Sequence, residues 1–149
     1  MNGILEKLSK LNGYLKNFNL EDRPEVTFNY VTGYDDAATL LQTRTGIQVL
    51  VVRPEARLAF KDLDEPQSIV MDTVFFALEK DLGAGRTSRL ECEQYDRTLE
   101  VLSDIFSKLM EDNEGCEGFA GLTLTSAEVK PESKVFASWN GYSLALEIE

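Results

Sequence analysis

The feature that most constrains the fold is an apolar stripe in the second half of the chain. Its residues recur at alternating steps of four and three, which places them on one face of an α-helix. They are Tyr95, Leu99, Leu102, Phe106 and Leu109, supplemented by Ile105. Ser88 followed by Glu91 matches a capping box at the start of such a helix. The pattern therefore predicts one long helix over residues 88–110.

A second helix is predicted at the N-terminus. Between residues 4 and 18 the apolar side chains are again spaced by three and four, which gives the segment one apolar face. Lysines 7, 10 and 16 lie on the opposite face, so a helix on a membrane surface is an alternative. We favour a helix that docks on the protein core.

Strand patterns fill the rest of the chain. Strands are predicted over residues 26–30, 39–43, 47–53, 69–80, 122–125, 135–139 and 142–148. Residues 39–43 and 47–53 are expected to form a hairpin, and residues 69–80 also tolerate helical spacing. Asn140-Gly141 is the preferred pair for a two-residue turn between the last two strands. Residues 61–67, acidic and containing Pro66, are expected to form a surface loop.

This order of elements predicts an α+β fold. Because no regular strand-helix-strand alternation occurs, we expect a mostly antiparallel sheet with the N-terminal helix and the long helix packed on one face. A chain of 149 residues has the usual size of one domain, so residues 1–149 are taken as a single domain. The apolar stripe, from Leu99 onward, is expected to pack on Val49, Val51, Leu144 and Leu146.

The charge and cysteine content indicate the compartment and exclude some partners. The formal charge of −11 repels phosphate backbones and anionic membranes, so neither nucleic acid nor membrane is an expected partner. Residues 1–10 lack the features of a signal peptide, and Cys92 and Cys116 have no disulfide-framework spacing. We expect a cytoplasmic protein with reduced thiols, and we interpret Cys92 as a packing residue, although a helix start could lower its pKa.

The chain lacks the residue types that most catalytic sites require. Without histidine it cannot form a Ser-His-Asp or Cys-His constellation, nor a histidine-based metal site. The carboxylates of residues 35–36 and 62–65 could hold a hard cation, yet they lack the spacing of a calcium loop. We therefore expect no catalytic residues, no cofactor and no metal.

One glycine-rich turn has an alternative function. Residues 83–88 (Gly-Ala-Gly-Arg-Thr-Ser) lie between a predicted strand and a predicted helix, where backbone amides and an arginine could bind an anion. The turn lacks the third glycine of a dinucleotide fingerprint and the lysine of a phosphate-binding loop, so an ordinary turn is favoured. The predicted interaction loops are this turn and the acidic loop, represented by Asp62, Asp64, Glu65, Gly83, Gly85 and Arg86.

The layout resembles the small tail-completion and neck proteins of bacterial prophages. The resemblance rests on the strand at residues 74–80, the following loop, the helix at residues 95–109 and the terminal segment of residues 139–148. It implies a non-enzymatic protein in a ring at the end of a tail tube or at a head-to-tail joint. Its partners would be other protein subunits, among them phage tail or neck proteins, and its location the virion. We expect a monomer in dilute solution and a homo-oligomeric ring on assembly.

Two alternatives stay open. Small acidic secretion-type chaperones and adaptors also combine an N-terminal helix, a group of strands and a long interface helix, and they bind a partner protein. In such a chaperone the helix at residues 88–110 would dimerise with its own copy. The other alternative is a small enzyme that uses the turn at residues 83–88.

Overall fold

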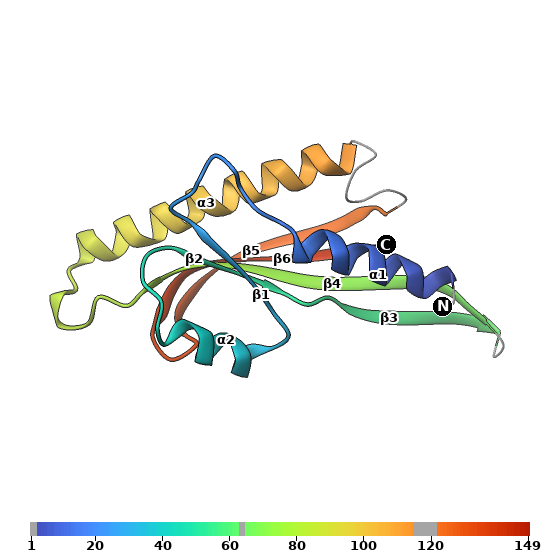
Figure 1. The fold of residues 1–149 in the computed structure, drawn as a ribbon, viewed down its shortest axis with the longest axis horizontal. Coiled ribbons are helices and arrows are strands. Elements are labelled where there is room, and N and C mark those ends of the chain that lie inside the picture. The colour runs from blue at the N-terminus through green and yellow to red at the C-terminus, as the bar shows by residue number, and fades with distance from the viewer. Residues whose placement is uncertain (1–2, 63–64, 115–121) are drawn as a thin grey trace.

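The protein folds around one sheet with helices on both of its faces (Figure 1). The computed structural model describes residues 3–62, 65–114 and 122–149. The helical elements are α1 (Gly3–Lys16), α2 (Tyr34–Leu41), the short 3-10 turn η1 (Gly83–Gly85) and α3 (Ser88–Glu114). The strands are β1 (Thr27–Val31), β2 (Gln48–Val52), β3 (Glu55–Asp62), β4 (Glu65–Lys80), β5 (Leu124–Val135) and β6 (Trp139–Ile148).

The sheet is mostly antiparallel, and the fold class is the predicted α+β. Its strand order is β1-β2-β4-β6-β5, with β3 paired to the first half of β4. Only β1 and β2 run parallel among the described pairs, and α2 forms the crossover between them. The strand predicted at residues 47–53 is β2, which lies inside the sheet between β1 and β4. Residues 69–80 belong to β4, so the strand prediction is confirmed there.

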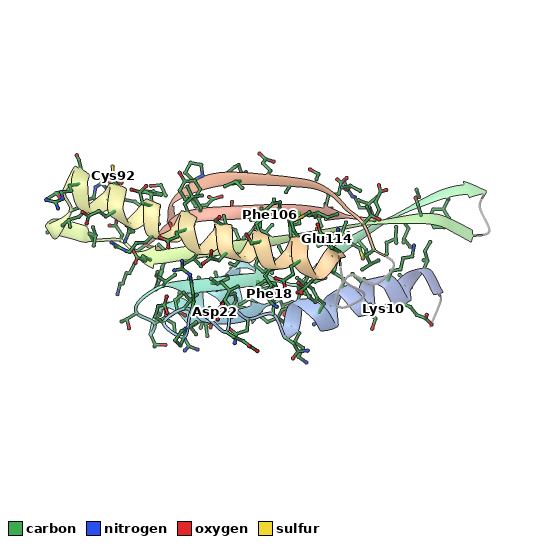
Figure 2. The ribbon with its side chains drawn as sticks, turned by 90° about the horizontal axis from the view of Figure 1, so that it is seen from above. Lys10, Phe18, Asp22, Cys92, Phe106 and Glu114 are labelled. Atoms are coloured by element: carbon green, nitrogen blue, oxygen red, sulfur yellow. The ribbon has the colours of Figure 1, made fainter. Side chains whose placement is uncertain are left out.

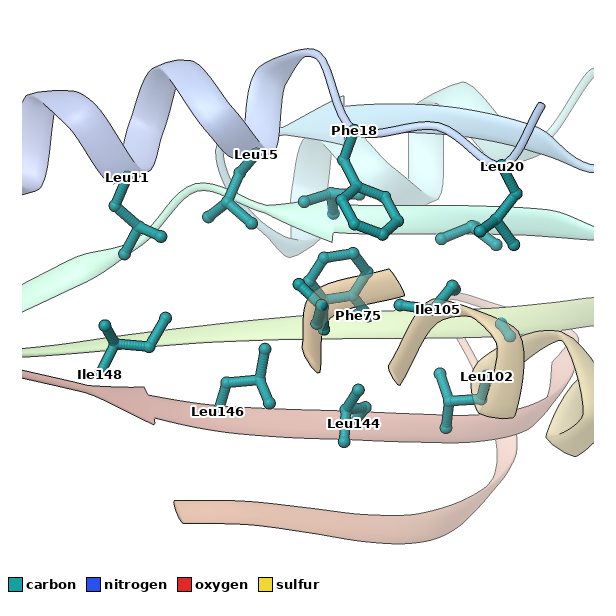
Figure 3. Close-up of a cluster of buried hydrophobic side chains, with 14 of the residues drawn as sticks. Leu11, Leu15, Phe18, Leu20, Phe75, Leu102, Ile105, Leu144, Leu146 and Ile148 are labelled. Atoms are coloured by element: carbon teal, nitrogen blue, oxygen red, sulfur yellow. The ribbon is translucent and has the colours of Figure 1, made fainter. Parts of the chain in front are cut away.

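The larger core lies under α1 and α3. Leu11 and Leu15 of α1, and Leu102 and Ile105 of α3, point toward the same face of the sheet (Figure 3). Leu109 of α3 belongs to the same buried cluster. Residues of β4 and β6 meet them there, including Phe75, Leu144, Leu146 and Ile148. Complete burial of one such side chain stabilises the fold by about 1.5–3 kcal/mol. The apolar face of α1 is thus used for docking within the protein, as predicted.

The smaller core lies on the opposite face, under α2. Since side chains alternate along a strand, Phe76 and Leu78 of β4 face α2 while Phe75 and Ala77 face the larger core. Trp139 closes the smaller core.

The predicted strand at residues 39–43 is wrong, and so is its hairpin with residues 47–53, because α2 continues to Leu41 and a turn follows it. Asp35 and Asp36 in the first turn suit the positive end of a helix, and Ala37 and Leu41, four residues apart, are both buried. Thr39 donates its hydroxyl to the Asp35 carbonyl one turn back.

The predicted turn at Asn140-Gly141 is also wrong, since both residues lie inside β6. The chain reverses at residues 136–138 instead. Asn140 is buried, and its amide donates to Asp81 Oδ1 at 2.8 Å and to Gln94 Oε1 at 3.2 Å. Its carbonyl oxygen accepts from the Lys134 backbone N–H at 2.7 Å. Tertiary contacts therefore override the local preference of this pair for a turn.

The acidic loop predicted at residues 61–67 is largely strand. β3 continues to Asp62 and β4 begins at Glu65, with these two residues paired in register at the end of the hairpin. Asp64 lies outside the described residues. The apolar residues Leu58 and Ile69 pair directly in the same ladder, and such cross-strand pairs stabilise a hairpin.

The long helix is present, but its buried face differs from the predicted stripe. Leu102 and Leu109 are buried in the cluster that also contains Val49, Val51, Leu144 and Leu146. Leu99 and Phe106 are 39% and 37% exposed, contrary to the prediction. The buried positions are Gln94, Thr98, Val101, Leu102, Ile105 and Leu109. α3 is therefore rotated so that one edge of the stripe faces outward.

The ends of α3 also differ from the sequence prediction. Thr87, and not Ser88, caps the helix, because its hydroxyl oxygen accepts the Leu90 backbone N–H at 3.2 Å. The helix continues past residue 110 to Glu114. Gly115, which the sequence suggested as a helix stop, and Cys116 lie outside the described residues.

Candidate functional site

The β3–β4 hairpin extends away from the body of the protein as an arm (Figures 1 and 2). β6 pairs with β4 only from Met71 onward, and β2 only from Phe75 onward. Earlier residues of β4 are paired with β3 alone. We call the two-stranded part, residues 58–62 and 65–70, the arm. Two-stranded hairpins are marginally stable in water without something to pack on.

One face of the arm is partly covered by α1, and its outer part is exposed. Ile69 is buried in the larger core together with Leu11 of α1. Leu58, its partner in the ladder, is 37% exposed, and Phe60 is 57% exposed. Phe60 lies two positions beyond Leu58 in β3, where the register of the hairpin shifts. The arm thus presents an aliphatic and an aromatic side chain beyond the area that α1 covers.

A second apolar surface lies between α3 and the edge strand β5. Ala127 and Val129 of β5 are paired with Leu146 and Leu144, so they lie on the core face of the sheet. They are nevertheless exposed, Val129 by 50%, because α3 packs over β4 and β6.

The exposed stripe residues of α3 lie on this same side. Tyr95 donates its hydroxyl to the Glu132 carbonyl of β5 at 3.1 Å, which fixes the side of the helix that faces β5. Leu99 and Phe106 are four and eleven positions from Tyr95, on the same helical face. Figure 2 places Phe106 on the side of α3 toward β5 and β6. We call Leu99, Phe106, Ala127 and Val129 the α3–β5 face.

The opposite flank of α3 is closed by ion pairs. Arg97 forms a bidentate pair with Glu79 of β4, at 3.0 and 2.8 Å, and this contact raises the Arg97 pKa. Arg23, in the segment after α1, donates to Glu100 at 2.8 Å and to Asp104 of α3, and these bonds raise its pKa as well. Exposed pairs of this kind add little stability individually. They leave the α3–β5 side as the open side of the helix.

Two groups of the glycine-rich turn that could bind an anion, the Arg86 side chain and the Gly83 amide, have partners within the chain. Arg86 is paired with Glu91 at 3.0 Å, so its charge is already matched by a carboxylate in the first turn of α3. Asp81 accepts the Gly83 backbone N–H at 3.3 Å, and the amide of Asn140 lowers the Asp81 pKa. The Arg86 charge and the Gly83 amide thus both have partners within the chain, which favours an ordinary turn. The positive φ of Gly83, 61°, explains one glycine of the turn.

The two predicted interaction regions lie at opposite ends of the molecule. The arm, with Asp62 and Glu65, extends at one end of the long axis, and the turn with Gly83, Gly85 and Arg86 lies at the other (Figure 1). The structure thus does not bring these residues together in one site. Sequence reasoning missed the exposed apolar residues of β3 and β5, although the paired apolar residues Leu58 and Phe60 at alternate positions were a signal for the arm.

Contrary to the expectation from the sequence, Cys92 does not pack in the core. It is exposed on α3 (Figure 2), because it lies on the outward side of the helix, two positions before the buried Gln94. In the described ranges, no group of three or more Cys, Asp or Glu side chains is placed to hold a metal ion. No helix in that part of the chain is both long and apolar enough to cross a membrane.

Comparison with known proteins found no matching family model and no matching curated protein. The arm and the α3–β5 face are the candidate contact surfaces of the described chain.

Proposed function

We propose that this chain is a non-enzymatic assembly protein that makes protein–protein contacts within a ring, as a prophage tail-completion or neck component would. The observation that carries the proposal is the arm, which holds Leu58 and Phe60 beyond the core. Exposed apolar side chains on a projecting hairpin are suited to burial against another subunit.

The placement of the surfaces supports a ring more than a two-fold dimer. The arm lies at one end of the long axis, while α3 begins at the other end, next to η1 (Figure 1). A contact between an arm and a different surface of the next copy is heterologous, and heterologous contacts generate rings when the rotation closes.

The charge of the chain explains why assembly would require high protein concentration or salt. Each copy carries a formal charge of −11, which opposes association at low ionic strength. Salt shortens the reach of this repulsion to about 10 Å at about 0.1 M. We therefore expect a monomer in dilute solution and larger species at high concentration and higher salt.

Light scattering across protein concentration and salt tests this proposal. We expect the average mass to rise with both, and Phe60→Ser to suppress the rise. Tyr34→Ser is the matched control, since it also removes an exposed aromatic ring but on α2. A mass that stays monomeric at millimolar concentration and high salt would contradict assembly through the arm.

The second candidate function is a secretion-type chaperone or adaptor that binds a partner protein. The observation that favours it is the exposure of Leu99 and Phe106 along the long helix. A tight dimer that is insensitive to salt, and that Leu99→Ser with Phe106→Ser dissociates while Phe60→Ser does not, would support this alternative.

The absence of enzymatic activity is part of the proposal and has its own test. Metal analysis of the purified protein should find no stoichiometric metal, and nucleotides should leave its melting temperature unchanged. A reproducible shift with ATP that is lost in Arg86→Ala would instead favour the small enzyme that uses the glycine-rich turn.

A further inference from the structure

A pocket on the α2 side of the sheet is lined by aromatic rings. It has a volume of about 480 Å³ and lies between the start of α2, the middle of β4 and the turn between β5 and β6. Its lining residues are Tyr34, Asp35, Ala38, Phe76, Glu132, Val135 and Phe136. It is separate from both the arm and the α3–β5 face.

Three aromatic rings, of Tyr34, Phe76 and Phe136, contact one another in the pocket. Phe76, which is only 5% exposed, lies at the base and meets Phe136 edge-on, with ring centroids 5.1 Å apart and an interplanar angle of 87°. Tyr34 is tilted by 34° against Phe136 at 5.5 Å and stands at 74° to Phe76 at 6.3 Å. Tyr34 is 63% exposed, so solvent and ligands can reach this residue.

The turn that holds Phe136 is strained. Lys134, Phe136 and Ala137 have φ angles of 52°, 49° and 79°, in the left-handed region that residues other than glycine rarely adopt. Such conformations persist only where the surrounding structure imposes them, and they cluster at binding sites. Here the buried Asn140 holds the turn through the Lys134 backbone N–H. The strained turn places the Phe136 ring against Tyr34 and Phe76.

Two carboxylates give the pocket a negative charge. Asp35 and Glu132 are the charged members of its described lining. Glu132 Oε1 accepts the Ser143 hydroxyl at 2.9 Å, which fixes its orientation. Aromatic faces attract cations, and a carboxylate beside the ring adds a charge-assisted hydrogen bond.

We propose that this pocket binds an arginine side chain of a basic partner protein. A planar guanidinium can lie flat on the Tyr34 or Phe136 ring while its N–H groups reach Asp35 or Glu132. A different, basic protein is favoured over a second copy at low salt, because a chain of charge −11 attracts a basic surface, whereas two copies associate only where salt screens their repulsion. This inference does not depend on ring formation or on the arm.

The test uses a peptide probe, acetyl-Gly-Arg-Gly-amide, titrated into the protein at low salt while the aromatic ring signals are followed by NMR. We expect saturable shifts of the Tyr34 and Phe136 signals. The same peptide with neutral citrulline in place of arginine should cause no saturable shift.

Two variants locate the binding. Tyr34→Leu and Asp35→Asn should each weaken the peptide by about twofold to fivefold, the range of an exposed cation–π contact. Asp22→Asn is the matched control, because it removes the same charge in the segment after α1 and should leave the affinity unchanged. Both pocket residues lie at the surface end of α2, so backbone amide spectra should report an intact fold.

Several results would overturn the inference. Equal shifts with the arginine and citrulline peptides would exclude cation recognition, and so would the absence of any saturable shift. If Asp22→Asn weakened peptide binding as much as Asp35→Asn does, the net charge of the protein, and not the pocket, would account for the attraction.

Discussion

Gly141 of β6 lies directly against the backbone of Ala77 in β4. A β-carbon built on Gly141 would be 2.0 Å from the Ala77 carbonyl oxygen, a distance that no packed structure tolerates. Gly141→Ala should therefore destabilise the protein by about 3 kcal/mol, at the upper end of overpacking effects. Urea denaturation measures the change.

Gly13 provides the control, because nothing lies within 4 Å of a β-carbon built there and the residue is inside α1. Gly13→Ala should stabilise the protein by about 0.5–1 kcal/mol. Equal effects of the two substitutions would contradict the close approach of β6 and β4.

The orientation of α3 can be tested with two leucines of the predicted stripe. Leu102 is 2% exposed and Leu99 is 39% exposed, although the sequence pattern treats them alike. Leu102→Ala should cost about 2–5 kcal/mol in the free energy of unfolding, since it leaves a cavity in the larger core. Leu99→Ala should cost about 1 kcal/mol or less in the monomer. A reversed order would mean that the predicted stripe, and not the rotated face, is buried.

The helix cap gives a further matched pair. Thr87 accepts the Leu90 backbone N–H, so Thr87→Ala should destabilise the protein by about 1 kcal/mol. Ser88→Ala should change the stability by less than about 0.5 kcal/mol, in the range of ordinary surface substitutions. Thermal melting of the two variants compares them directly, and a larger effect at Ser88 would restore the capping box that the sequence suggested.

Tyr14 predicts how stability depends on alkaline pH. Burial, then the hydrogen bond to Asp112 of α3 at 2.6 Å and the charge of that carboxylate, raise the pKa of Tyr14 above its ordinary value of 10.0. In the unfolded chain Tyr14 ionises near pH 10, while in the folded chain it stays neutral. Its contribution is therefore complete below pH 10 and is lost as the pH rises above that value.

The variant Tyr14→Phe should lose about 1 kcal/mol at pH 7, the net value of one hydrogen bond. Because only the wild type loses the Tyr14 contribution above pH 10, the stability difference between the two proteins should narrow there. Urea denaturation from pH 7 to pH 11 measures both. A difference that stays constant over this range would show that Tyr14 titrates alike in both states.

The sequence predicted those parts of the fold that depend on repeating apolar patterns. The periodicities were sufficient to locate α1, α3, β1, β2 and β6, because each element buries apolar side chains at helical or strand spacing. Local preferences failed where a distant contact decided the structure. Asn140-Gly141 is a pair that favours a turn, yet both residues lie in a strand. Asn140 donates to Gln94, and Gly141 packs against the backbone of Ala77, two residues far away in sequence.

The candidate surfaces were harder to predict because exposure depends on neighbouring elements. Val129 alternates like a core residue and lies on the core face of its strand, but α3 does not extend over it. Phe60 is also an apolar strand residue that stays exposed. It lies in the part of the β3–β4 hairpin that β6 does not reach. The sequence around a strand residue does not determine whether a helix from another part of the chain extends over it.

The central claim, assembly through the arm, is tested most directly by a photo-crosslinking residue at position 60. Phe60 can be replaced by benzoylphenylalanine, which keeps an aromatic side chain, and the protein irradiated at high concentration and salt. We expect crosslinks between copies that join position 60 to a surface other than the arm, as a heterologous ring contact requires. Crosslinks from arm to arm would contradict this account, and so would crosslinks confined to single chains under conditions where the protein is associated.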